Sequence, residues 1–328
     1  MEKRSYLWVI LLIGSILLSS CGAEVPVAEK STAAEKSTAV EKSIAVEEME
    51  STITAEMQSP EESIQEPVRI AVLDSGISTT AIDPKSLDGG LNHIKPLSGT
   101  EDTIGHGTAV ASIIVGSETA GVEGICPQAV LVPLVYCAED YLGRTVNADA
   151  VTIGEMIYEA VDTFECDMIN ISAASATDDK YLREAVEYAI EQGVIVIACA
   201  GNTNLTTPEN VYYPGAYEDV ICIGSVNNEG AVSDFSQRGT SLDFVAPGEE
   251  IPAAAMDGAA VAVTGTSFAT AYVTGLVANI LMENPDLNRT PEKAQEAVME
   301  ALKELAEDIN GAGWNEDYGW GVLGRKAL

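Results

Sequence analysis

Short apolar runs alternate with helical segments along most of the chain, and this alternation restricts the fold more than any other feature. The runs are rich in Val, Ile and Ala and lack the polar alternation of a strand with one solvated face. Such continuous runs are typical of strands buried on both faces of a parallel sheet. We expect strands at residues 68–73, 129–136, 167–172, 194–199 and 220–226. The alternation predicts an α/β fold, with a doubly wound, mostly parallel sheet and helices on both faces.

The segments between and after these runs carry the signals of helices. Gly193 follows one of them as a C′ residue does, and the helical period occurs at residues 107–116, 149–164 and 179–192. A buried helix begins near Ser267, because one helical face after it collects Val273, Leu276, Val277 and Ile280. The final helix is expected to begin with Thr290 as N-cap and Pro291 as its first residue.

The balance of charges excludes one class of partner. Of the 328 residues, 46% are apolar, which is enough to fill a sizeable core, but Asp and Glu outnumber Lys and Arg by 51 to 17. The formal net charge of −34 repels phosphate backbones, so a nucleic acid is not an expected partner. The acidity indicates either a strongly solvated surface or one that attracts basic substrates and cations.

The six cysteines do not form a metal-binding pattern. They contain no CxxC pair, and zinc templates with fewer cysteines need histidines, of which the chain has only His93 and His106. We therefore expect no zinc site and assign no metal ligands, and we expect His93, which lies outside any motif, at the surface. Buried free thiols are expected at Cys166, Cys199 and Cys222, which lie in or beside apolar runs. One disulfide among the internal cysteines remains open, because export would place them in an oxidising compartment.

The N-terminal segment resembles the signal of a bacterial lipoprotein. Lys3 and Arg4 precede an apolar stretch, residues 7–18, that suits a secretory signal but is short for a membrane span. Cys21 follows in the sequence Leu-Ser-Ser-Cys-Gly, which resembles a lipobox. The resemblance implies a signal peptide at residues 1–20 and a lipidated Cys21. The protein would then be exported and anchored at the outer side of the bacterial cell membrane or on the periplasmic face. An uncleaved membrane helix, or an ordinary signal with a chance cysteine, is the alternative.

Residues 21–66 are expected to form a low-complexity stalk. They contain a degenerate repeat, Ala-Glu-Lys-Ser-Thr-Ala, at 28–33 and 34–39, and no aromatic residue. Such a segment cannot bury enough apolar surface to offset the entropy lost on ordering. Residues 67–328 would then form the folded domain, which the stalk holds away from the membrane.

Three short motifs supply an acid, a base and a nucleophile. Asp74 follows the first expected strand in Asp-Ser-Gly, at the carboxyl end where open α/β sheets bind ligands. His106 opens a helix in Gly-His-Gly-Thr, and Ser267 opens another in Gly-Thr-Ser-Phe-Ala. A serine hydroxyl becomes a good nucleophile when an imidazole takes its proton and a carboxylate holds that imidazole. Taken singly, each of these residues could be an ordinary turn residue with no catalytic role.

Together the motifs resemble those of the subtilisin-like serine proteases, in which acid, base and nucleophile occur in the same order. The resemblance covers about residues 68–324 and includes Gly121-Val122, Pro127-Gln128-Ala129, Asn170-Ile171-Ser172, Ala200-Gly201-Asn202, Tyr213-Pro214 with Val220-Ile221, Phe235-Ser236, and Ala246-Pro247-Gly248. It implies a subtilisin-like fold and a serine endopeptidase that cleaves peptide or protein substrates through an acyl-enzyme. It also implies a monomer that needs no cofactor for its chemistry, while a structural calcium ion remains open.

The resemblance implies a role for each matched residue. Asp74 would orient the imidazole, His106 would act as general acid and base, and Ser267 would be the nucleophile. Asn202 would donate its side-chain amide to the oxyanion of the tetrahedral intermediate, together with the backbone N–H of Ser267.

The resemblance also implies where a peptide lies. Two edges would pair with an extended substrate, one formed by Ser172, Ala173 and Ala174 and the other by Ala200 and Gly201. Tyr212 stands at the floor of the first specificity pocket, where family members often have a small residue. Its ring would shorten the pocket and select a small residue before the cut. The alternative is a ring that is turned outward.

The chain departs from the family pattern in several respects. Ala271 stands where Pro usually follows the nucleophile, and Ala continues a helix without strain. Residues 22–66 lack the core pattern of the pro-domain that secreted members often carry, so we expect no such domain. The missing pro-domain and the narrow predicted pocket favour a processor of one exported precursor peptide. A catalytically silent cell-surface module that binds peptides is the alternative function, and the complete set of four site residues argues against it.

Overall fold

The computed structural model describes residues 66–324, except for 209, 286, 288–290, 310 and 312. The predicted signal peptide at 1–20, the predicted lipidation site Cys21 and nearly all of the predicted stalk at 21–66 lie outside the described residues. Thr290, the predicted N-cap of the last helix, lies outside them too. None of the helices that the structure does describe has the length and apolar character needed to cross a membrane.

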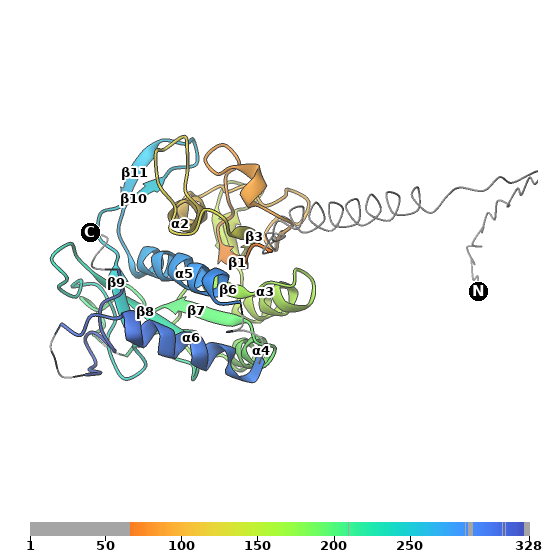
Figure 1. Cartoon of the computed structure of the whole chain (residues 1–328). Coiled ribbons are helices and arrows are strands. Elements are labelled where there is room, and N and C mark those ends of the chain that lie inside the picture. Colours follow the sequence, from red (N-terminus) through yellow and green to blue (C-terminus); the bar gives the residue numbers. More distant parts are fainter. Residues whose placement is uncertain are drawn as a thin grey trace, which may run out of the picture. The chain divides into compact units, whose positions relative to one another are not determined.

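A seven-stranded parallel sheet forms the centre of the domain (Figure 1). Its strand order is β2-β3-β1-β6-β7-β8-β9, and each neighbouring pair is parallel. The five predicted strands are confirmed within one residue at either end: β1 (Arg69–Asp74), β3 (Val130–Val135), β6 (Met168–Ile171), β7 (Ile195–Cys199) and β8 (Ile221–Val226). The order turns at β1, which has β3 on one side and β6 on the other. The carboxyl end of β1 is therefore a switch point, the place where such sheets bind ligands.

The apolar pattern of the sequence does not predict six shorter strands. The two edges of the large sheet are β2 (Leu91–Asn92) and β9 (Phe244–Pro247). Two antiparallel hairpins form small sheets of their own: β4 (Cys137–Glu139) with β5 (Thr145–Asn147), and β10 (Ile251–Ala254) with β11 (Ala260–Val263). These strands are too short to show a period, and β9 ends in a proline, which an edge strand tolerates.

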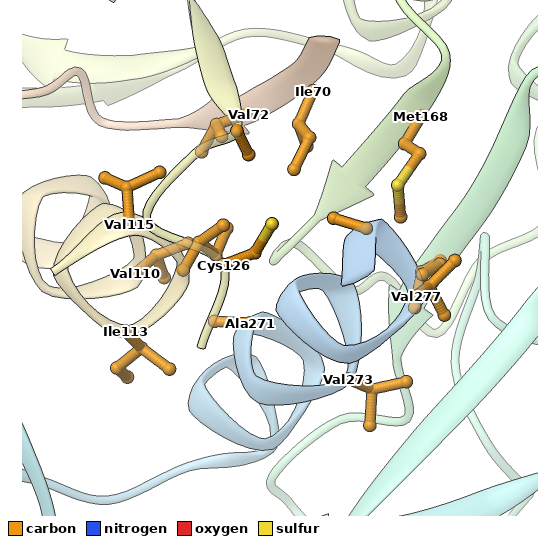
Figure 2. Close-up of a cluster of buried hydrophobic side chains, with 14 of the residues drawn as sticks. Ile70, Val72, Val110, Ile113, Val115, Cys126, Met168, Ala271, Val273 and Val277 are labelled. Atoms are coloured by element: carbon orange, nitrogen blue, oxygen red, sulfur yellow. The ribbon is translucent and has the colours of Figure 1, made fainter. Parts of the chain in front are cut away.

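Helices cover both faces of the sheet, as predicted. They are α2 (His106–Val115), α3 (Ala150–Asp162), α4 (Lys180–Glu191), α5 (Thr266–Glu283) and α6 (Pro291–Leu305). Ile70 and Val72 of β1 face a core that they share with α2, α5 and α6, whereas Ala71 and Leu73 face a second core with α3 and α4. Figure 2 shows Ile70 and Val72 opposite side chains of α2 and α5. The continuous apolar runs therefore reflect strands that are buried on both sides.

The cysteines and His93 test the predictions made outside the motifs. Cys166, Cys199 and Cys222 are buried free thiols, as expected, and the other described cysteines are free as well. His93 corrects a prediction, because it is half-buried rather than a surface histidine. Its Nε2 atom lies 2.7 Å from Oε2 of Glu159.

Candidate active site

An acid and a base meet where β1 ends and α2 begins. Asp74 is buried, and its carboxylate oxygens lie 2.8 Å and 2.9 Å from Nδ1 of His106. Gly107 allows this approach, because a Cβ at that position would lie 2.2 Å from the carbonyl oxygen of Gly76 and 3.1 Å from Asp74 Oδ1. The structure thus brings together two of the residues that the sequence motifs singled out.

Opposing effects act on the pKa of His106. Burial lowers this pKa and is the largest single effect. The charge of Asp74, its hydrogen bond to the ring and the charge of Asp102 raise it, and the net result is a raised pKa. Because Nδ1–H donates to Asp74, the neutral ring presents an acceptor at Nε2. A ring held in this way can take a proton from a hydroxyl group.

Ser267 is the second residue of α5, and its side chain lies near the end of β6. Its hydroxyl donates to the carbonyl oxygen of Ser172 at 3.4 Å, and the Ser172 hydroxyl donates to the carbonyl oxygen of Ser267 at 3.5 Å. The next residue, Phe268, packs against the imidazole of His106, with 5.2 Å between the ring centroids. The start of α5 therefore lies beside His106. Within the described residues, however, the Ser267 hydroxyl is hydrogen-bonded to Ser172 and not to the imidazole.

A buried thiol lies next to Ser267. Hydrogen bonds with the hydroxyls of Thr266 and Ser267 lower the pKa of Cys199, but burial is the larger effect and raises it to about 11. The thiol therefore stays protonated at neutral pH, and a protonated thiol is a poor nucleophile. Cys199 fills space beside the serine and does not compete with it.

The side chain of Asn202 is oriented by the start of α5. Its Oδ1 accepts hydrogen bonds from the backbone N–H and the hydroxyl of Thr266, each at 2.9 Å. Its Nδ2 faces Gly265, at 3.4 Å from the position a Cβ would take there. The donating Nδ2 group of Asn202 therefore lies beside Gly265, just before the first turn of α5.

A surface hollow of about 380 Å³ follows the end of β6. Its lining includes Ser172, Ala173 and Ala174, and of these Ser172 is buried, Ala173 half-buried and Ala174 exposed. Tyr136 and residues at the end of β5 and just after it also line this hollow. Ala173 and Ala174 are therefore accessible at this surface, and their role as a peptide-pairing edge stays a prediction.

The backbone of Ala200 and Gly201 corrects the second predicted edge. Both residues are buried, and their carbonyl oxygens accept from the backbone N–H groups of Tyr212 at 2.9 Å and Gln237 at 3.0 Å. Their own N–H groups donate to the Ile223 carbonyl at 2.9 Å and to the Thr266 hydroxyl at 3.3 Å. These groups are already paired inside the protein, so Ala200 and Gly201 form a wall and not an open edge.

The ring of Tyr212 is turned inward against that wall. A Cβ on Gly201 would lie 3.1 Å from Cδ2 and 3.3 Å from Cγ of the Tyr212 ring, so the ring packs against the glycine. The Tyr212 hydroxyl lies 2.6 Å from Oγ1 of Thr203, the residue after Asn202. The ring therefore lies between Gly201 and the residue after Asn202, and it is not turned outward.

Comparison with known proteins identifies the family. The model of the subtilase family, peptidase S8, matches residues 65–321. The chain belongs to the subtilase family. The minor extracellular protease Epr of Bacillus subtilis (strain 168) is 30% identical over 261 residues, which cover 79% of this chain and 38% of Epr. Subtilisin Savinase of Lederbergia lenta is 31% identical over 219 residues, which cover 66% of this chain and 77% of that protein.

Solved structures of other proteases have the same fold as this subtilase. A mutant of the protease domain of PatA has a TM-score of 0.67 at 26% identity and covers 81% of this chain and 95% of its own. The prenylagaramide maturation protease PagA has a TM-score of 0.62 at 26% identity, with 79% and 91% covered. The predicted subtilisin-like fold is confirmed, and by family the protein is a serine-type endopeptidase.

Sequence reasoning missed two residues that organise the site of this subtilase. Thr266 orients Asn202 and also accepts the N–H of Gly201, although it stands inside the motif that revealed Ser267. Asp102 is a buried carboxylate three residues before Gly105, and only its position ahead of a histidine motif could have signalled it. Among the described residues, no three His, Cys, Asp or Glu side chains converge as a metal site requires.

Proposed function

We propose that the chain is an exported, membrane-anchored serine endopeptidase in which Asp74, His106 and Ser267 act as acid, base and nucleophile. The contact of Asp74 with Nδ1 of His106 carries the proposal, because it holds the imidazole with Nε2 free to accept a proton. The packing of Phe268 on the same ring supports it, since this contact brings the start of α5 to the base.

The proposed reaction begins when Ser267 rotates from the Ser172 carbonyl toward Nε2. Its oxygen attacks the carbonyl carbon of the scissile peptide while its proton passes to His106, and Asp74 stabilises the imidazolium that forms. His106 then gives the proton to the leaving amine as the C–N bond breaks. A water molecule activated by the same imidazole hydrolyses the acyl-enzyme and returns the serine.

The oxyanion of each tetrahedral intermediate would lie at the N-terminus of α5. Asn202 Nδ2 and the backbone N–H of Ser267 would donate to it, in a position where the helix dipole also favours negative charge. The two bonds from Thr266 to Asn202 Oδ1 support this assignment, because they turn the donating end of the amide toward the helix start.

The substrate of this proposed enzyme is an extended peptide with a small residue before the cut. Ala173 and Ala174 would pair with its backbone, and the Tyr212 ring would close the pocket that holds the side chain. We expect Ala, Gly or Ser to be preferred there in a peptide library, and Tyr212→Gly to shift the preference toward large aromatic residues. A wild-type preference for aromatic residues that Tyr212→Gly leaves unchanged would contradict this specificity.

The biological setting proposed here is the processing of an exported peptide at a membrane. PagA is a maturation protease by name, and a lanthipeptide protease with a TM-score of 0.65 at 25% identity is a further structural neighbour. The anchor would be the lipid on Cys21. Labelling of cells with a fatty-acid analogue tests it, since the label must be lost in Cys21→Ala while the protein is still made.

A fluorophosphonate tests the proposed chemistry directly, because it reacts with an activated serine. The purified protein should gain the mass of one adduct, mapped to Ser267 by peptide sequencing. Ser267→Ala and His106→Ala should abolish the adduct, whereas Ser233→Ala, at a buried serine in another loop, should retain it. The absence of an adduct on protein shown to be folded would favour the silent peptide-binding module.

A further inference from the structure

A second buried carboxylate lies beside the Asp74–His106 pair. It belongs to Asp102, which is 6% exposed, in the loop that leads into α2. Its Oδ1 accepts from the Ser75 hydroxyl at 2.9 Å and from the N–H groups of Ile104 and Gly105, each at 2.8 Å. Its Oδ2 accepts from the N–H of Thr108 at 2.9 Å and from the Thr108 hydroxyl at 2.7 Å. Five hydrogen bonds therefore fix the position of this buried carboxylate.

These bonds connect the loop of the acid to the helix of the base. The Ser75 hydroxyl, which donates to Asp102, accepts the N–H of Gly107 at 2.9 Å. The backbone N–H of Ser75 donates to Asp74 Oδ1 at 2.7 Å. Asp102 is therefore linked through one residue, Ser75, both to the acid and to the residue that follows His106.

Asp102 also supplies the side-chain cap that the N-cap residue of α2 lacks. The N-cap of α2 is Gly105, which has a φ of 103° and no side chain to accept from the first turn. The carboxylate of Asp102 accepts the N–H of Thr108 in that turn instead. An anion at this position interacts favourably with the positive end of the helix dipole. His106 is the first residue of the same helix.

We infer that Asp102 is a positioning residue for His106, which ties the Asp74 loop to the first turn of α2 and places a second fixed negative charge beside the imidazole. The inference depends on the proposed function only for the role of His106 as base.

The charged groups that act on the imidazole are the two carboxylates, and both raise the pKa of His106. From α5, the neutral ring of Phe268 packs against it. Three further titratable groups near the carboxylates have raised pKa values and stay neutral at pH 7: Tyr136, Cys137 and Cys199. Loss of the charge of Asp102 should therefore lower the pKa of His106.

An NMR titration tests the inference without requiring catalysis. The chain has two histidines, so His93→Gln identifies the ring signals of His106. In protein labelled with ¹⁵N-histidine and carrying Ser267→Ala to prevent self-cleavage, Asp102→Asn should move the titration midpoint of His106 to lower pH. The Nδ1 proton should also exchange faster with water, because the ring is held less firmly.

A matched control comes from α3. Asp149 accepts the N–H of Thr152 at 2.9 Å and its hydroxyl at 2.8 Å, the same pair of bonds that Asp102 makes with Thr108. Asp149→Asn should leave the His106 midpoint unchanged. A folded Asp102→Asn protein with an unchanged midpoint, or an equal shift in Asp149→Asn, would overturn the inference.

Ser75→Ala distinguishes the effect of the Ser75 bridge from the effect of the Asp102 charge. It also provides a test if Asp102→Asn does not fold. It keeps the carboxylate but removes the bridge to the acid loop, so the midpoint should stay near the wild-type value. The rate of fluorophosphonate labelling at Ser267 should fall about tenfold through misplacement of the base. An unchanged labelling rate would contradict the positioning role. If wild-type protein is not labelled, the proposed function fails, and the NMR midpoints still decide the role of Asp102.

Discussion

Two pairs of helices in this domain begin in different ways. α3 and α4 each begin after an aspartate in extended backbone, Asp149 or Asp179, whose side chain accepts N–H groups of the first turn. α2 and α5 each begin after a glycine, Gly105 or Gly265, that makes no side-chain cap bond. The second pair carries the proposed base and nucleophile. The helices that serve only the fold are thus capped locally, and those that serve the site are capped by more distant side chains.

Caps from outside the N-cap position connect α2 and α5 to the loops of the candidate site. Asp102 accepts from the first turn of α2, and Asn202 accepts the first N–H of α5 from another loop. Each cap connects its helix to a loop at the carboxyl ends of the strands, so the helix start and the loop hold one another in position. A glycine before the helix also leaves room for a ligand near the N–H groups and the positive end of the dipole.

The largest effect is expected from Asn202→Ala, which removes both the cap of α5 and the proposed oxyanion donor. kcat should fall by about 10² to 10³, the range known for loss of such a donor in the relative subtilisin, with little change in KM. The free energy of unfolding should fall by only about 1 kcal/mol, as for loss of a cap. Steady-state kinetics and urea unfolding measure the two quantities.

The control for this variant is Asn204→Ala in the same loop. Asn204 donates its side-chain amide to the Asp234 carbonyl at 3.2 Å. Its kcat should remain near the wild-type value. A loss of kcat in Asn204→Ala as large as that in Asn202→Ala would mean that loop disorder, and not a lost donor, explains both.

Gly107→Ala should show how closely the base helix approaches the acid loop. Alanine in place of glycine ordinarily stabilises a helix by about 1 kcal/mol. Here the new Cβ would lie 2.2 Å from the Gly76 carbonyl oxygen, so we expect a destabilisation of about 2 kcal/mol and slower labelling of Ser267. Gly154→Ala in α3, where the nearest atom is 3.3 Å away, should cost less and leave labelling unchanged. A Gly107→Ala protein of unchanged stability would show that α2 and the acid loop can move apart freely.

The pH dependence should follow His106. Only the neutral imidazole can act as base, so kcat/KM should fall as the pH decreases through the pKa of His106, which lies above the ordinary value of 6.5. Because the pKa is higher in the folded protein, the associated stability is fully present below the unfolded pKa and is lost as pH rises through the folded pKa. Activity and this part of the stability therefore change in opposite directions. An acid limb below pH 6.5 would contradict the assignment.

The contrast between local and distant contacts also explains what the sequence could predict. The strands around Ile70 and Ile197 were predictable because burial on both sides leaves a continuous apolar run. Gly193 marked a helix end because its φ of 85° suits glycine.

The features of the candidate site that the sequence did not predict depend on contacts between residues far apart in sequence. Asn202 is 64 residues from Thr266, and nothing local indicates that the two are hydrogen-bonded. The wall at Ala200 and Gly201 was mistaken for an open edge for the same reason, since Gln237 and Tyr212 occupy its carbonyl groups only in the folded chain. Motif order located the proposed reacting groups, but the side chains that hold them in place could be identified only in the structure.

The smallest effect is expected from a local cap that serves the fold alone. Asp179 accepts the N–H groups of Tyr181 and Leu182 at 2.8 Å and 3.1 Å, so Asp179→Ala should lower the free energy of unfolding by about 1 kcal/mol in urea. kcat/KM should stay within about twofold of wild type, because α4 presents none of the proposed reacting groups. Asp179→Asn should recover most of the stability, since asparagine is as good an N-cap. If Asp179→Ala instead reduced kcat as strongly as Asn202→Ala, local and distant caps would be equivalent, and the arrangement at α2 and α5 would have no special connection with the site.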